Sequence, residues 1–152
     1  MVPLLLFSTE VEPIDLSATG GWGETIDQSH LISGAGSNLA DAYESLTNAT
    51  TISVSGCTGD TDNWRVEVSR IDQGGWYENL TIYVRRTSDG TGSGWVADGL
   101  SYIEVNSTGS QFFTGAGDRT NISIQYRLAG MSVMVPPENY STTISFAVVD
   151  IP

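Results

Sequence analysis

Residues 121–152, NISIQYRLAGMSVMVPPENYSTTISFAVVDIP, decide the fold class of this chain. Over 122–128 apolar side chains alternate with polar ones, and the same period of two returns over 131–135 and 143–148. This alternation is typical of strands that bury one face. The breaker cluster at 136–139 separates the last two strands, because proline cannot donate to a central ladder. The chain is therefore predicted to end in two or three antiparallel strands joined by tight turns.

Further strands are predicted along the rest of the chain, between Gly-rich turns. They occupy 25–32, 51–55, 64–69, 80–85 and 102–106. Short strands at this spacing favour an all-β, immunoglobulin-like antiparallel β-sandwich. One helix of about two turns is predicted over 38–46, where Asn38 could cap it. Its shared apolar face would consist of Leu39, Ala42, Tyr43 and Leu46.

Length and composition narrow the class of protein. The 152 residues suffice for one domain with a real core, and the net charge of −12 argues against nucleic acid or an anionic membrane as partner. All six basic residues are arginine, so Lys–Asn isopeptide bonds are excluded. No stretch approaches the roughly 20 apolar residues of a membrane span. The abundance of Ser, Thr, Gly and Asn predicts an extracellular location, with any signal peptide already removed.

The N-terminal run at residues 2–7 is apolar on both faces. Such a terminus would be an aggregation hazard in a monomer, so we expect it to be buried in a neighbouring subunit. We interpret residues 1–16 as an extension, made of a donor strand and a linker, and residues 17–152 as the β-sandwich domain. The donor-strand residues are Val2, Leu4, Leu5, Leu6, Phe7 and Val11.

Candidate catalytic residues are few. His30 is the only histidine, with Asp27 nearby and Ser29 or Ser33 as possible nucleophiles, but nothing around them resembles a strained nucleophile turn. Cys57 is the only cysteine, so no intrachain disulfide is possible, and no adjacent basic residue lowers its pKa. We interpret it as a small, dispensable residue at a strand end. No enzyme activity and no cofactor are predicted.

No metal site is predicted, and a calcium site in the loop around residue 60 is the alternative. Asp60, Asp62 and Asn63 offer hard oxygen ligands in one loop, which calcium prefers. The loop lacks the glycine and the distal glutamate of a twelve-residue calcium loop. Turn-forming Asp and Asn residues explain the pattern equally well.

Five Asn-x-Ser/Thr sequons make asparagine glycosylation a candidate modification. Their acceptors are Asn48, Asn79, Asn106, Asn121 and Asn139. The strand phase supports this interpretation, because the inward phase of Leu80 and Ile122 directs the preceding asparagines outward. The alternative is a polar β-protein that is simply rich in Asn and Thr.

Aromatic residues offer a possible sugar-binding platform. The candidates are Trp22, Trp64, Trp76, Trp95, Tyr77 and Tyr83. Trp64 is in phase with Val66 and Val68, which predicts a core position. Trp76 and Trp95 adjoin turns and could be exposed, although packing in a core or an interface is the competing interpretation.

The C-terminal part, from Asn121 through the Pro136-Pro137 turn with Tyr140 to the Thr-rich last strand, resembles the end of the spore-coat-U and fimbrial subunit group. The resemblance covers about 35 residues. It implies an extracellular immunoglobulin-like domain that a neighbour's N-terminal strand completes. The chain lacks that group's usual cysteine pair, which argues against a chaperone–usher route.

We therefore expect a structural subunit of an extracellular filament, pilus- or fimbria-like, or of a surface layer. Identical subunits would form a homopolymer by donor-strand exchange. The groove that receives the strand is predicted to contain Ile122, Ile124, Tyr126, Leu128, Ile144, Phe146 and Val148. The alternative is a monomeric extracellular carbohydrate-binding or adhesive module whose partners are surface glycans.

Overall fold

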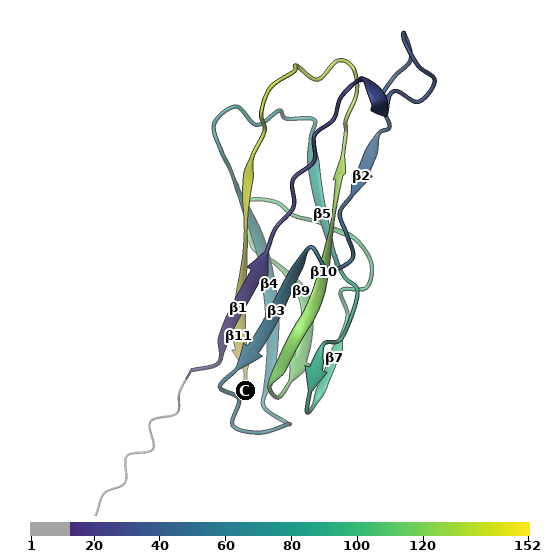
Figure 1. The fold of residues 1–152 in the computed structure, drawn as a ribbon. Coiled ribbons are helices and arrows are strands. Elements are labelled where there is room, and N and C mark those ends of the chain that lie inside the picture. The colour runs from purple at the N-terminus through teal and green to yellow at the C-terminus, as the bar shows by residue number, and fades with distance from the viewer. Residues whose placement is uncertain (1–12) are drawn as a thin grey trace, which may run out of the picture.

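The computed structural model describes residues 13–152 and is all-β, with two antiparallel sheets around one core (Figure 1). The first sheet contains, in spatial order, β1 (Asp15–Gly20), β3 (Thr50–Ser55), β10 (Arg119–Ala129), β5 (Thr81–Arg86) and β8 (Ile103–Glu104), with β2 (Ala42–Glu44) and β6 (Thr91–Gly92) also on β10. The second contains β11 (Thr142–Ile151), β4 (Asn63–Asp72), β9 (Ser110–Ala116) and β7 (Trp95–Ala97).

The period-two pattern places the core residues on these strands. Inward-facing side chains of both sheets form one buried cluster, whose largest members include Trp64 on β4 and Phe113 on β9. The Trp64 ring meets the Phe113 ring edge-on and its indole N–H donates to the carbonyl of Gly117 at 3.0 Å. The predicted core position of Trp64 is confirmed, as are the strands predicted over 51–55, 64–69 and 80–85.

The helix predicted over 38–46 is wrong. Ala42–Glu44 is strand β2, which pairs with Arg127–Ala129 of β10. The side chain of Asn38 accepts hydrogen bonds from the backbone N–H groups of Leu39 and Val133 and does not cap a helix. A helix of two turns is marginal alone, and the part of β10 that extends beyond its pairing with β3 offers this segment strand partners.

Two predicted strands are also wrong. Within 25–32 the chain forms a short 3₁₀ turn, Gln28–His30. Within 131–135 it leaves the sheet, because the backbone turns at Gly130, where φ is 85°. Only glycine fits at this turn, since a Cβ there would collide with the carbonyl of Asn79. The N–H of Met131 donates to Asp41 at 3.3 Å, and Val135 closes a turn onto Ser132 at 3.0 Å.

The sandwich is less well covered along one side. Within the described part of the chain β1 pairs only with β3, and β11 pairs only with β4, so both are edge strands. These two edges belong to opposite sheets and lie next to each other. The inward residues of β11, including Phe146, are half-buried, whereas Val66 and Val68 on the neighbouring β4 are fully buried. β1 begins at Asp15, so the last two residues of the predicted extension belong to the sandwich.

Candidate functional site

A cavity of about 890 Å³ lies at the end of the sandwich where β1 finishes and β11 starts. Gly20 at the end of β1 and Ile144 near the start of β11 both line it. The loops 21–31 and 131–141 contribute the other walls, and Figure 1 shows them gathered at the end opposite to the start of β1. We call this hollow the end cavity.

The surface of the end cavity is mainly apolar. Leu80 and Ile82 contribute buried side chains, and the indoles of Trp22 and Trp76 pack half-buried against the core. The phenol of Tyr126 donates to the hydroxyl of Thr50 at 2.7 Å, and burial raises its pKa. Because that polar atom has its partner inside the protein, the ring offers the cavity an apolar face.

The predicted groove residues fall into three groups. Tyr126, Leu128 and Ile144 line the end cavity. Phe146 and Val148 are half-buried along β11. Ile122 and Ile124 are fully buried, so their place in an open groove is corrected: β10 lies inside the first sheet, and the second sheet covers them.

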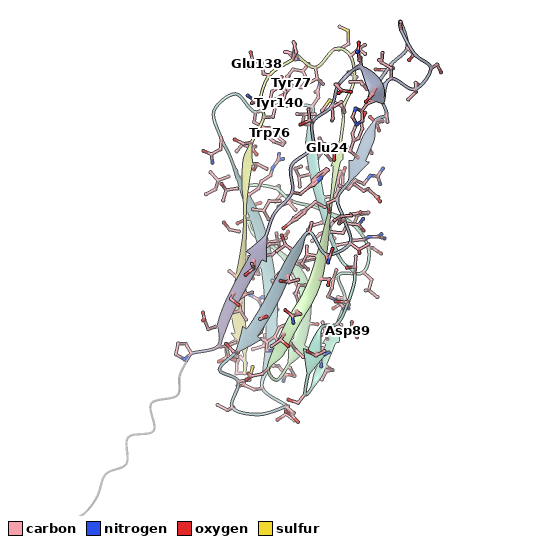
Figure 2. The ribbon with its side chains drawn as sticks, viewed as in Figure 1. Glu24, Trp76, Tyr77, Asp89, Glu138 and Tyr140 are labelled. Atoms are coloured by element: carbon pink, nitrogen blue, oxygen red, sulfur yellow. The ribbon has the colours of Figure 1, made fainter. Side chains whose placement is uncertain are left out.

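A second, smaller hollow of about 360 Å³ lies beside the end cavity. Trp76, Tyr77 and Glu78 line it from the connection between β4 and β5, while Glu138 and Tyr140 come from the connection between β10 and β11 (Figure 2). We call it the aromatic hollow. The sequence patterns missed Tyr140; its only signal was its position in the Pro-Pro turn.

The remaining platform candidates do not meet there. Trp64 is buried in the core and Trp22 lines the end cavity. Trp95 is nearly half exposed on β7 in the second sheet, and Tyr83 is on β5 in the first. The aromatic hollow therefore gathers only Trp76 and Tyr77 of the six predicted residues, and adds Tyr140.

The side chains around His30 form a capping arrangement. The hydroxyl of Ser29 donates to the Asp27 carboxylate at 2.6 Å, and His30 Nδ1 lies 3.2 Å from the same carboxylate and from the backbone N of Asp27. The hydrogen bonds from Ser29, first from its side chain, lower the pKa of Asp27. The Ser29 hydroxyl also lies 3.4 Å from His30 Nδ1, and Asp27 and His30 together form the capping box of the 3₁₀ turn. The backbone N–H of Ser33 donates to the hydroxyl of Ser37 at 2.9 Å.

The loop of Asp60, Asp62 and Asn63 has the chemistry of a turn. The Asp62 carboxylate accepts from the N–H of Thr58 at 2.7 Å and from the Thr58 hydroxyl at 3.1 Å. Among residues 13–152 no three His, Cys, Asp or Glu side chains gather as metal ligands. Asp62 is therefore committed to local bonds of the kind that stabilise turns.

Cys57 lies in a half-buried position next to acidic groups. Its backbone N–H donates to the Asp118 carboxylate at 2.9 Å. Burial, followed by the hydrogen bond and charge of Asp118, raises the pKa of the thiol to about 12. Since the thiolate is the reactive form, this thiol is poorly nucleophilic at neutral pH.

We expect iodoacetamide at pH 8 to alkylate native Cys57 at least about 100-fold more slowly than the same thiol in the urea-unfolded chain, because a raised pKa leaves little thiolate. Mass spectrometry over time measures both rates. Asp118→Asn removes the negative charge and should speed alkylation of the native protein. Equal native and unfolded rates would contradict this prediction.

All five sequon asparagines are exposed. The predicted outward phase is observed: Leu80 and Ile122 are buried, while Asn79 and Asn121 face solvent. Asn121 has φ 58° at an irregularity in the pairing of β10 with β3, which turns it away from the ladder. In residues 13–152 no helix has the length and apolarity needed to cross a membrane.

Comparison with known proteins found no match to this chain among family models, curated protein sequences or solved structures.

Proposed function

We propose that this protein is the structural subunit of an extracellular filament or surface layer and that it polymerises by donating its N-terminal strand. The observation that carries the proposal is the apolar end cavity, which a chain with an apolar N-terminal run can fill. The role is structural, with no reaction catalysed. Assembly of this kind needs an acceptor surface and a donor segment on each subunit.

The acceptor is the uncovered side of the sandwich together with the end cavity. In the described residues β1 and β11 each have one edge without a strand partner, and edge backbone groups are available to an added strand. Half-buried Phe146 and Val148 would lose their remaining exposure beneath it. An inserted strand thus supplies backbone hydrogen bonds and apolar contacts together, as in donor-strand complementation.

The donor segment, residues 2–11, lies outside the residues that the structure describes. Its role as a donor is therefore inferred from its sequence and from the place where it joins β1. It holds Val2, Leu4, Leu5, Leu6, Phe7 and Val11. Each Leu or Phe that becomes fully buried contributes about 1.5–3 kcal/mol, so four contribute roughly 6–12 kcal/mol before the entropic cost of ordering the segment.

The attachment point favours assembly between molecules. The described chain begins at Pro13, beside the first residue of β1, whereas the end cavity lies at the other end of the molecule (Figure 1). A segment from one subunit that enters the cavity of the next makes a head-to-tail contact. Such contacts are heterologous, so they propagate into a fibre unless the ring closes.

The immunoglobulin-like topology and the extracellular location belong to the same proposal. In immunoglobulin-like domains the first and last strands are edges of opposite sheets, as β1 and β11 are here. The exposure of all five sequon asparagines supports glycan attachment and hence an extracellular surface. Peptide mass spectrometry of the native protein tests that attachment.

Self-closure is the competing arrangement. Twelve extended residues span about 40 Å, enough for the segment to turn back beside β1 and fill the cavity of its own chain. The protein would then be a monomer, and the alternative function, an adhesive or carbohydrate-binding module, would fit it. The aromatic hollow is the observation that favours this second candidate.

Deletion of residues 1–10 tests the proposal. We expect the full-length chain to form filaments in negative-stain images, and the truncated chain to stay monomeric with unchanged β-type circular dichroism. A synthetic peptide of residues 1–11 should bind the truncated chain one-to-one, and a scrambled peptide should not. Normal polymerisation of the truncated chain would refute strand donation, and so would a full-length chain that stays monomeric.

A further inference from the structure

We propose that the aromatic hollow binds an uncharged sugar, a binding activity separate from strand donation. The hollow joins two connections that are distant in the sequence, one around Tyr77 and one around Tyr140 (Figure 2). Its volume, about 360 Å³, lies within the range of small-molecule sites. The rings of Tyr77 and Tyr140 are 6.4 Å apart between centroids and tilted by 50°, so they form two walls of an open angle.

Hydrogen bonds position two of the aromatic side chains that line the hollow, those of Tyr140 and Trp76, before any ligand binds. The Tyr140 hydroxyl donates to the carbonyl of Pro136 at 2.7 Å. The indole N–H of Trp76 donates to the carbonyl of Leu80 at 3.1 Å. These bonds restrict the positions of the Tyr140 and Trp76 side chains, so ligand binding costs less entropy to order them.

The lining chemistry fits an uncharged polyol. Aromatic faces cover the C–H face of a sugar ring, and the exposed carboxylates of Glu78 and Glu138 can accept hydrogen bonds from its hydroxyl groups. The same carboxylates, on a chain with net charge −12, repel an acidic sugar.

An organic cation is the other ligand that aromatic rings and carboxylates attract. Here the protein already supplies a cation, because the guanidinium of Arg70 lies 5.2 Å from the centroid of the Trp76 ring. One face of the Trp76 ring is therefore already covered by a positive charge of the protein. This leaves hydroxyl-rich neutral ligands as the better match.

The hollow can be changed without touching the end cavity. Trp76, Glu138 and Tyr140 line both spaces, but Tyr77 and Glu78 line only the aromatic hollow. Tyr77→Ala and Glu78→Gln therefore test sugar binding separately from strand donation. The matched control is Trp95→Ala, which removes a partly exposed tryptophan from β7, in the second sheet.

The experiment is a calorimetric titration of the full-length chain, which works on filaments and monomers alike, with maltotriose, cellotriose, mannobiose and lactose, each up to about 10 mM. We expect at least one of them to bind with a measurable heat and to change the tryptophan fluorescence of the chain. Tyr77→Ala should weaken that binding at least tenfold and Glu78→Gln severalfold, while Trp95→Ala leaves it unchanged. Circular dichroism confirms that each variant folds; Glu78 is exposed, so Glu78→Gln provides the test should Tyr77→Ala unfold.

Charge selectivity completes the test. Sialyllactose should bind more weakly than lactose, since the two differ by one carboxylate-bearing sugar. Binding by none of the four neutral saccharides overturns the proposal. So does binding that survives both hollow variants, or binding of choline at these residues in place of saccharides.

Discussion

Two assembly-defective variants are expected to form a one-to-one complex when mixed, although neither polymerises alone. The first keeps its N-terminus but carries Leu128→Arg, which places a charge on the wall of the end cavity. The second lacks residues 1–10 and keeps an intact cavity. The donor of the first fits the acceptor of the second, but the resulting pair has no further usable donor–acceptor match. Sedimentation velocity should show a dimer-sized species only in the mixture.

The physical reason is the difference between an apolar and a charged acceptor wall. A charge left in an apolar contact without a partner costs several kcal/mol, enough to remove much of the roughly 6–12 kcal/mol expected from the donor side chains. In the free subunit the long arginine can extend from the open cavity to water, so the fold tolerates it. Leu100→Arg is the control, because Leu100 is 61% exposed and does not line the cavity. The Leu100→Arg chain should polymerise normally. Strand donation would be contradicted if the Leu128→Arg chain and the chain without residues 1–10 stayed monomeric when mixed.

Arg86→Met is expected to lower the free energy of unfolding by about 3 kcal/mol. Arg86 is only 2% exposed, on the inward face of β5. Its guanidinium donates to the carbonyl of Asp98 at 2.9 Å, to that of Ser88 at 3.2 Å, and to the carboxylate of Asp89. Methionine fills a similar volume but leaves the carbonyl groups of Asp98 and Ser88 without the donor that Arg86 supplies. Because the Asp89 side chain is largely exposed, most of the loss comes from those carbonyls.

Arg65→Met is the matched control for Arg86→Met. Arg65 pairs with Glu67 at 2.9 Å on the partly exposed face of β4, where ion pairs contribute less than about 1 kcal/mol. Urea titrations followed by tryptophan fluorescence measure both variants, and equal m-values would validate the comparison. If the two substitutions cost the same, Arg86 does not hold the 87–90 loop in the way its contacts indicate.

The sequence by itself determined the β class and the faces of the main strands. The period of two over 64–68 and 80–84 identifies the side chains that the core buries, because alternation across a strand is a local property of the extended backbone. Arg86 faces inward like Val84, two residues earlier on the same strand. Its burial could not be predicted, because an alternation of apolar residues marks apolar side chains as buried and does not mark a charged one. Its burial depends on carbonyl groups of the loop around Asp89 and of Asp98, which only the folded chain brings to it.

Only the tertiary structure decided the segments where local preference was weak. Residues 42–44 have helical spacing but join the sheet, because β10 offers them backbone partners. Residues 131–135 alternate like a strand, yet bonds to Asp41 and Asn38 draw them away from the sheet. In both segments, partners far along the chain outweigh a local propensity that is worth less than about 1 kcal/mol per residue.

The candidate sites depend on the tertiary structure for the same reason. A pattern could mark Trp76 and Tyr77 as residues beside a turn, but not that the Tyr140 ring would lie 6.4 Å from Tyr77. Nor could it show that the connections after β1, β4 and β10 meet around one cavity. Alternation specifies which face of a strand is apolar; whether another element covers that face depends on how the edges of the two sheets are placed.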